Sequence, residues 1–166
     1  MKLLIIGHAR HGKDVFADYL CKELGLKKLS SSWVALDKFI YKALSPIMGY
    51  QSKGECYKDR VNHRALWYEL IKAYNHHDKA RLTTEVYKVS DMYVGLRDDQ
   101  EFSATVEKFN PIIIGVFDPR KPLESEKSFK VGDFKLDHLV INNGSLEDLE
   151  NKAKELALTL RKEEEC

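Results

Sequence analysis

The chain has 166 residues, which favours a single domain with room for a sizeable hydrophobic core. Its shares of hydrophobic residues, 43%, and of charged residues, 32%, are ordinary for a soluble globular protein. The formal net charge of +1 provides no global basic field, so bulk charge predicts no non-specific binding to nucleic acid.

The cysteines and the N-terminus indicate a cytoplasmic protein. Cys21, Cys56 and Cys166 are odd in number, widely spaced and without a CxxC motif, which favours reduced thiols over a disulfide framework. The apolar run Leu3–Ile6 is too short for a signal-peptide core or a membrane span. We therefore expect no association with a membrane.

The beginning of the chain predicts a strand, a loop and a helix. Leu3–Ile6 is a continuous apolar run, as in a strand that is buried on both faces of a parallel sheet. Phe16, Leu20 and Leu24 recur every four residues, which indicates a helix. Gly7–Lys13 is therefore a glycine-bounded loop between a strand and a helix, which is the setting of a phosphate-binding loop.

Each residue type in this loop suits a phosphate. Gly7 permits a sharp exit from the strand, and Gly12 lets the backbone approach an anion, which the N–H groups and the dipole of the following helix favour. Lys13 supplies a positive charge for the outer phosphates of a nucleoside triphosphate. The alternative is a glycine-rich turn in another kind of α/β protein.

Asp14 departs from the pattern G-x-x-x-x-G-K-[ST], in which a hydroxyl at this position meets the metal. A carboxylate can hold Mg²⁺ directly or through water, so Asp14 is a candidate metal ligand. It could equally be an acid that stabilises the first turn of the helix.

The rest of the chain predicts strands and helices in alternation. A short strand at Lys27–Leu29 precedes a helical insertion at about 33–89, with helices near Trp33–Leu44, Tyr57–Tyr74 and Asp78–Val89 and a stop at Pro46 and Gly49. Later strands are predicted at Asp91–Leu96, Ile112–Phe117 and His138–Ile141. A helix at Asp98–Phe109 lies between the first two of them, and a polar lid loop at about 118–135 precedes the last. The terminal helix is predicted to be capped by Ser145 and Asp148. This alternation predicts an α/β protein, with helices on both faces of a five-stranded parallel sheet.

Ligands of such sheets bind at the carboxyl ends of the strands, which would gather Gly7–Lys13, Arg97 and Asp118–Arg120 around one crevice. We favour an anion contact for Arg97 over an ordinary surface charge. Arg120 lies either in a lid that excludes water or in an ordinary turn. For His8 and His11 we expect loop packing or donation beside a phosphate, because a metal pair would lack further ligands nearby.

A cluster in the middle of the chain could bind an acceptor. Arg60 and Arg64 are four residues apart, so on one helix their guanidinium groups could grip a phosphate together. The alternative is that both are solvated. Trp67 could stack on a base, but its apolar neighbours at helical spacing favour a place in the core.

Three segments resemble a known family. GHARHGKD (7–14) resembles the phosphate loop of bacteriophage deoxynucleoside monophosphate kinases. DHLVINNGSLEDL (137–149) is similar to the final strand and helix of those enzymes and of dephospho-coenzyme A kinases. Tyr93–Phe102 resembles the third-strand segment of the family and the arginine that follows it, here Arg97. The resemblance covers both ends of the chain well and its centre poorly.

The resemblance implies a P-loop NTPase fold of the nucleoside monophosphate kinase type, with ATP and Mg²⁺ as cofactors and a small nucleotide as substrate. By the same resemblance, Lys13 would contact the transferred phosphoryl group and Arg97 the acceptor phosphate. Arg120 would lie on the lid side of the donor, and Asn142–Gly144 near its adenine.

One departure concerns the carboxylate that orients the acceptor or the metal. The family has an aspartate two residues before the position of Arg97, and Gly95 stands there in this chain. The alternative candidates for this role are Asp14, Asp37, Asp59 and Asp118.

The function predicted from the sequence is therefore an ATP-dependent kinase of deoxynucleoside monophosphates, in the host cytoplasm if the protein comes from a phage. One alternative is a P-loop kinase that acts on a hydroxymethylated base in phage DNA, with Arg60 and Arg64 on the strand backbone. Another is a non-catalytic nucleotide-binding module, which Asp14 and Gly95 favour. A homodimer is also considered.

The candidate residues fall into three overlapping groups. Those for the cofactor are Gly7, His8, Ala9, Arg10, His11, Gly12, Lys13, Asp14, Val15, Asn142, Asn143 and Gly144. Those for the substrate are Ser31, Asp59, Arg60, Arg64, Trp67 and Arg97, and those for catalysis are Lys13, Asp14, Arg97 and Arg120.

Overall fold

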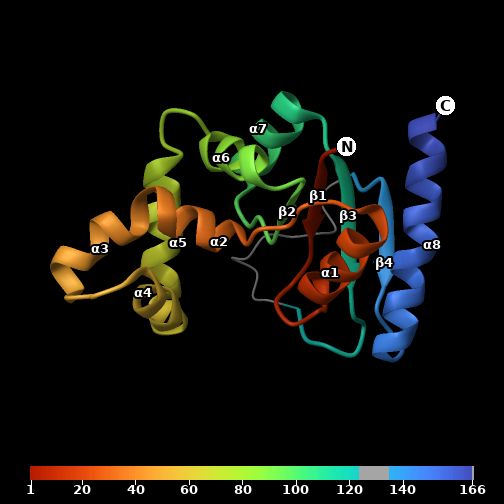
Figure 1. The fold of residues 1–166 in the computed structure, drawn as a ribbon, viewed down its shortest axis with the longest axis horizontal. Coiled ribbons are helices and arrows are strands. Elements are labelled where there is room, and N and C mark those ends of the chain that lie inside the picture. The colour runs from red at the N-terminus through yellow and green to blue at the C-terminus, as the bar shows by residue number, and fades with distance from the viewer. Residues whose placement is uncertain (124–134, 166) are drawn as a thin grey trace.

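A parallel sheet forms the centre of the protein in the computed structural model, which describes residues 1–123 and 135–165. Its strands are β1 (Leu3–Ile6), β2 (Met92–Val94), β3 (Ile112–Phe117) and β4 (His138–Ile141), in the order β2-β1-β3-β4 (Figure 1). Leu3 pairs with Met92 on one side and with Ile112 on the other. The prediction of an α/β protein with a parallel sheet is therefore confirmed.

Helices bury both faces of this sheet. The residues of β1 are all 0% exposed, and their side chains alternate between two cores, as the period of a strand requires. Leu3 and Ile5 pack with α1 (Lys13–Leu24) and α8 (Leu146–Glu165). Leu4 and Ile6 pack with the helical insertion and with α7 (Asp99–Phe109).

The helical insertion connects α1 to β2 and begins and ends against the sheet. Its elements are α2 (Ser31–Ala35), a π-helical turn (Leu36–Ile40), α3 (Tyr41–Met48), α4 (Lys53–Asp59), a 3-10 turn (Arg60–Asn62), α5 (Arg64–Tyr74) and α6 (Arg81–Val89). Helices α3, α4 and α5 lie farthest from the sheet, beyond β2 (Figure 1). The predicted helical character of residues 33–89 is thus confirmed.

Two predictions within the insertion need correction. The first helical run continues through Pro46 to Met48, because a proline in the last turn forfeits only one helical hydrogen bond, and the left-handed Gly49 then ends it. The single helix predicted for Tyr57–Tyr74 is broken at His63, whose φ of −128° and ψ of 32° are not helical.

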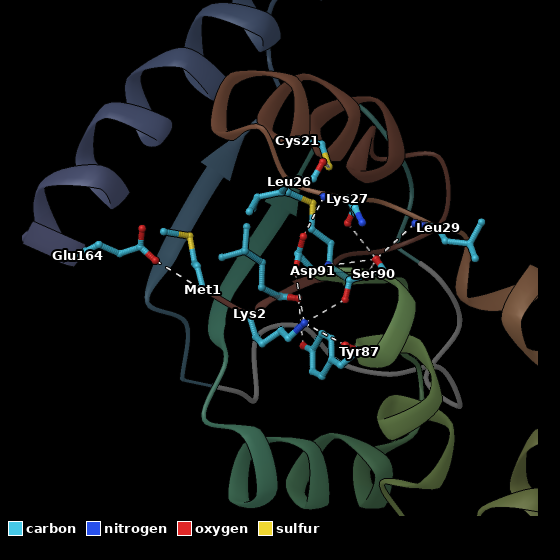
Figure 2. Close-up of polar contacts among 12 residues, drawn as sticks. Met1, Lys2, Cys21, Leu26, Lys27, Leu29, Tyr87, Ser90, Asp91 and Glu164 are labelled. Atoms are coloured by element: carbon cyan, nitrogen blue, oxygen red, sulfur yellow. Dashed lines mark hydrogen bonds and ion pairs between the residues drawn. The ribbon is translucent and has the colours of Figure 1, made fainter.

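The predicted strand at Lys27–Leu29 is also wrong, so the described part of the sheet has four strands and not five. The segment does lie beside the start of β2, but side chains make most of its hydrogen bonds (Figure 2). Lys27 N–H donates to Asp91 Oδ2 and Leu29 N–H to Ser90 Oγ, and one backbone bond runs from Asp91 N–H to Lys27 O. Because side-chain acceptors replace the neighbouring backbone carbonyls, no ladder forms.

Lys2 fixes the end of α6 in the same region (Figure 2). Its Nζ donates to the carbonyls of Tyr87, at 2.9 Å, and Ser90, at 3.2 Å, and forms an ion pair with Asp91. A cation is favourable at the C-terminus of a helix, where carbonyl groups lack helical partners. This contact joins the residue before β1 to the junction between α6 and β2.

Side chains cap the start of each of the last two helices, and the cap of α8 is the one that the sequence predicts. Asp98 Oδ1 accepts from Glu101 N–H at the start of α7. Ser145 Oγ accepts from Asp148 N–H, and Asp148 Oδ2 accepts from Ser145 N–H, which is the reciprocal capping box predicted for α8.

Cys21 and Cys56 are free and buried. No helix in the described part of the chain is long and apolar enough to cross a membrane.

Glu101 is a buried acid between α6, β2 and α7, with only 3% of its surface exposed. Tyr93 Oη donates to its carboxylate at 2.9 Å and Thr83 Oγ1 at 3.3 Å, and Thr83 also bonds Thr105. Burial is the main cause that raises the pKa of Glu101 to about 7 from 4.5, although the hydrogen bonds act in the opposite direction.

We predict that Glu101→Gln flattens the pH dependence of stability. Since the pKa of Glu101 is higher in the folded than in the unfolded state, the wild type loses stability as the pH rises from about 4.5 to about 7. The amide cannot ionise, so the variant does not lose this stability. Between about pH 4.5 and about pH 7, its free energy of unfolding relative to that of the wild type should rise by up to ~3 kcal/mol. Urea unfolding at several pH values measures this. Glu107→Gln, on the exposed side of α7, is the matched control, and an equal pH slope for Glu101→Gln and wild type would contradict the prediction.

Candidate active site

The candidate site lies at the carboxyl ends of the four parallel strands, where the segments after β1, β2, β3 and β4 begin at residues 7, 95, 118 and 142. The chain leaves β1 toward β2 on one side and leaves β3 toward β4 on the other. The space between β1 and β3 is thus the topological switch point, at which sheets of this kind bind ligands.

Glycines shape the loop between β1 and α1. A Cβ on Gly7 would lie 2.5 Å from Val116 O, so only glycine lets the loop pass this close to β3. Arg10 and Gly12 both have positive φ, of 65° and 88°. Left-handed residues that alternate with others in this way are typical of backbone nests, whose N–H groups converge on an anion.

Lys13 begins α1 and is buried, with 7% of its surface exposed. Its side chain crosses Gly95, because a Cβ there would lie 3.2 Å from Lys13 Cε. Gly95 also has a φ of 81° and donates its N–H to Ile5 O at 2.9 Å, which extends the pairing of β1 and β2. Gly95 therefore leaves room for the side chain of Lys13.

His11 packs inside the loop and joins it to the segment after β3. It is fully buried, and its ring lies 5.2 Å from that of His8 and 5.4 Å from that of Phe117, between centroids. Asp118 N–H donates to His11 Nδ1 at 3.0 Å, so the ring proton sits on Nε2, which donates to Pro122 O. The expectation of loop packing is confirmed for His11, and the described residues hold no group of three or more metal-ligating side chains.

Arg120 forms hydrogen bonds with protein groups, and 53% of its side chain is exposed. Its Nε and Nη2 donate to the two oxygens of the buried Asp118, both at 2.9 Å, and this pair lowers the pKa of Asp118 to about 2. Nη1 and Nη2 also donate to the carbonyls of Gly144 and Asn142. The place of Arg120 on the lid side of the donor stays a prediction, and residues 124–134 of the predicted lid lie outside the described residues.

The segment after β4 touches the loop between β1 and α1 directly. Asn142 Nδ2 donates to His11 O at 3.2 Å, and a Cβ on Gly12 would lie 2.5 Å from the same nitrogen. Gly144 packs against the capping Asp148, whose Oδ2 would lie 2.3 Å from a Cβ there. Asn142 therefore lies beside Gly12, whereas Gly144 packs against the first turn of α8.

Asp14 is the candidate carboxylate most open to a metal ion. Its side chain is 71% exposed in the first turn of α1, and its Oδ2 lies 3.6 Å from Lys13 Nζ. Protein sites for Mg²⁺ in nucleotide enzymes often supply one or two carboxylates, and phosphates and water provide the other ligands. The donor set at this loop therefore fits Mg²⁺ in the company of a bound nucleotide.

The other candidate carboxylates have protein partners. Asp37 accepts from Lys53 Nζ at 2.6 Å, and this bond is the main cause that lowers its pKa. Asp59 accepts from Tyr50 Oη at 2.6 Å, which most lowers its pKa, and from Asn62 Nδ2 at 2.7 Å. These contacts hold the insertion together, and those of Asp118 hold Arg120.

Arg60 is half-buried and stacked on an aromatic ring. Its guanidinium carbon lies 4.5 Å from the ring centroid of Tyr57, and Nη1 donates to Tyr57 Oη at 3.2 Å. Tyr57 Oη also bonds Ser30 Oγ at 3.2 Å, beside Ser31, whose hydroxyl donates to Val94 O at the end of β2. This chain of contacts links Arg60 to the ligand edge of the sheet.

Other predicted acceptor residues lie differently. Trp67 is 4% exposed and belongs to the core, as its apolar neighbours at helical spacing predict. Arg64 is exposed at the start of α5, and the helix break at His63 removes the four-residue spacing that was to align it with Arg60. Arg97 is exposed and lies three residues beyond the end of β2.

Two features of the site were not predicted from the sequence. Tyr57 lies three residues before Arg60, a helical spacing that could have indicated their contact. The approach of Asn142 to Gly12 joins residues 130 positions apart, and no local pattern indicates it.

Comparison with protein-family models and with curated proteins finds no match for this chain.

We predict that Gly12→Ala destabilises the protein more than Gly25→Ala does. Both glycines are left-handed, at φ 88° and 68°, so each alanine should cost roughly 1–2 kcal/mol in backbone strain. Only at Gly12 does the new methyl also collide with Asn142, because nothing lies within 4 Å at Gly25. Urea unfolding measures the free energy of unfolding of the two variants. Equal losses of this free energy would show that the contact between Asn142 and Gly12 is not tight.

Proposed function

We propose that the protein is a P-loop kinase of the nucleoside monophosphate kinase type, which transfers the γ-phosphoryl group of ATP to a deoxynucleoside monophosphate. The observation that carries this proposal is the loop from Gly7 to Lys13. It joins a buried strand to a helix, has left-handed residues at Arg10 and Gly12, and ends in a buried lysine at the ligand edge of a parallel sheet. This combination suits a chain of phosphates better than it suits an uncharged ligand.

In this proposal an oxygen of the acceptor phosphate attacks the γ-phosphorus, the bond between that phosphorus and the β–γ bridging oxygen breaks, and ADP leaves. The chain has no covalent step to perform, so catalysis is positioning and stabilisation of charge. The loop N–H groups and Lys13 would hold the donor phosphates, and Arg97 would hold the acceptor phosphate. Asp14 would hold Mg²⁺, which supplies positive charge beside the phosphates.

Arg60 supports an acceptor side in the insertion. A guanidinium that is stacked on Tyr57 and tied to its hydroxyl is held in one orientation, so less entropy is lost when it binds an anion. The contacts from Tyr57 through Ser30 and Ser31 to Val94 connect this group to the same edge of the sheet as Lys13.

A coupled assay of ADP release tests the proposed reaction, with ATP, Mg²⁺ and each deoxy- and ribonucleoside monophosphate. We expect release that depends on one or a few monophosphates, and a loss of roughly 100-fold or more in Lys13→Ala, as for removal of one key donor to the transition state. Lys22→Ala, on the exposed side of the same helix, is the matched control and should keep the activity.

If no monophosphate supports ADP release, the proposal fails. DNA with hydroxymethylated bases is then the acceptor to try. ATP binding without turnover on any acceptor would favour a non-catalytic nucleotide-binding module.

We predict that Arg60→Ala raises KM for the acceptor by roughly 10- to 100-fold, the loss expected for one hydrogen bond to a charged group. The value of kcat should change less, because Arg60 would contact the acceptor before and during transfer alike. Arg81→Ala is the matched control, since Arg81 also lies over an aromatic ring, at 4.0 Å from the Tyr74 centroid. An unchanged KM in Arg60→Ala would remove this residue from the acceptor site.

A further inference from the structure

Four residues from three different loops form a closed ring of hydrogen bonds, here called the His11–Arg120 ring. Asp118 N–H donates to His11 Nδ1 at 3.0 Å, and Arg120 Nε and Nη2 donate to the carboxylate of Asp118 at 2.9 Å. Arg120 Nη2 also donates to Asn142 O at 3.1 Å, and Asn142 Nδ2 donates back to His11 O at 3.2 Å. The ring thus links the loops that follow β1, β3 and β4.

The members of the ring have little freedom to adopt other positions. His11 is fully buried and uses both ring nitrogens, the second on Pro122 O at 3.2 Å. Asp118 is 2% exposed, and both its oxygens accept from Arg120. A forked pair of charge-assisted bonds is directional as well as strong, so it fixes the plane of the guanidinium.

The phosphate loop depends on such outside support. Its internal backbone bond, from His11 N–H to His8 O, is long at 3.4 Å. Arg10 holds a left-handed conformation that non-glycine residues adopt at a cost of roughly 1–2 kcal/mol. A loop whose N–H groups converge also gathers partial positive charges, which repel each other when no anion is bound. Contacts from neighbouring loops are therefore needed to keep its shape.

We propose that the His11–Arg120 ring presets the phosphate loop for its anion before any ligand arrives, with His11 and Arg120 as positioning residues. In this arrangement Arg120 does not contact the nucleotide. It holds Asn142 against Gly12 and Asp118 against His11, so loss of the Arg120 side chain should loosen the loop at both contacts. The consequence for ATP affinity rests on the proposed function, whereas the preset loop does not.

Backbone ¹⁵N relaxation of the nucleotide-free protein tests the proposal. We expect order parameters near ~0.85 for residues 8–12 in the wild type, as for rigid backbone, and values below ~0.6 in Arg120→Ala. Arg120→Lys keeps the charge but loses the fork, so it should loosen the loop as well and serves if the alanine variant does not fold. Arg81→Ala, which removes a guanidinium bonded to Tyr74 O away from the site, should leave the loop rigid.

A pair of substitutions at His11 separates the ring from general packing. In His11→Asn, the side-chain oxygen takes the place of Nδ1 and accepts the hydrogen bond from Asp118 N–H. In His11→Gln, the amide nitrogen takes the place of Nε2 and donates to Pro122 O. His11→Asn keeps the ring closed and should keep the loop rigid, and His11→Gln opens the ring and should loosen it. The opposite order, or equal loosening, would contradict a role for the ring.

Isothermal titration with ATP gives the second readout. Arg120→Ala should raise Kd for ATP by roughly 5- to 100-fold, the usual range for coupled groups, while His11→Asn stays near the wild type. If the wild type does not bind ATP, the proposed function fails, and the relaxation data still decide whether the ring sets the loop. If the wild type binds ATP but residues 8–12 are equally ordered in Arg120→Ala, the ring proposal is overturned and the proposed function stands.

Discussion

The burial of β1 on both faces is the constraint from which the remaining structure follows. Four consecutive residues without any exposed surface require two separate cores, and each core requires its own layer of helices. Because β2 and β3 pair with β1 in parallel, every strand ends at the same edge of the sheet. The loops that carry Gly12, Gly95, Asp118 and Asn142 are therefore neighbours, although they are far apart in the sequence.

Close backbone approach shapes the site as much as its charged groups do. Gly7 passes against Val116 O, Gly12 against the amide of Asn142, and Gly95 beneath the side chain of Lys13. A side chain at any of these positions would push a loop or the lysine away. At Gly95 the side chain of Lys13 occupies the space that a Cβ would enter, and Asp14 is the exposed carboxylate beside the loop.

Two kinds of polar contact in this protein have different physical roles. Asp118, Arg120, His11 and Asn142 are joined across loops and hold the geometry of an edge that faces solvent. Glu101, in contrast, is enclosed by α6, β2 and α7, where hydrogen bonds from Tyr93 and Thr83 only partly offset the loss of hydration. The first network orders a site, and the second makes the stability of the core depend on pH.

The sequence by itself determined the elements whose signals are local. The apolar runs of β1, β3 and β4, the capping box of Ser145 and Asp148, and the glycine-bounded loop before Lys13 are all found where their residues indicate. Tertiary structure alone decided the rest. The side chains of Ser90 and Asp91 accept hydrogen bonds from the backbone of Lys27–Leu29, so this segment does not form a strand. Arg120 donates to backbone carbonyls of a loop more than 20 residues away in the sequence. Such outcomes depend on which distant acceptor lies within reach, and spacing along the chain carries no information about that.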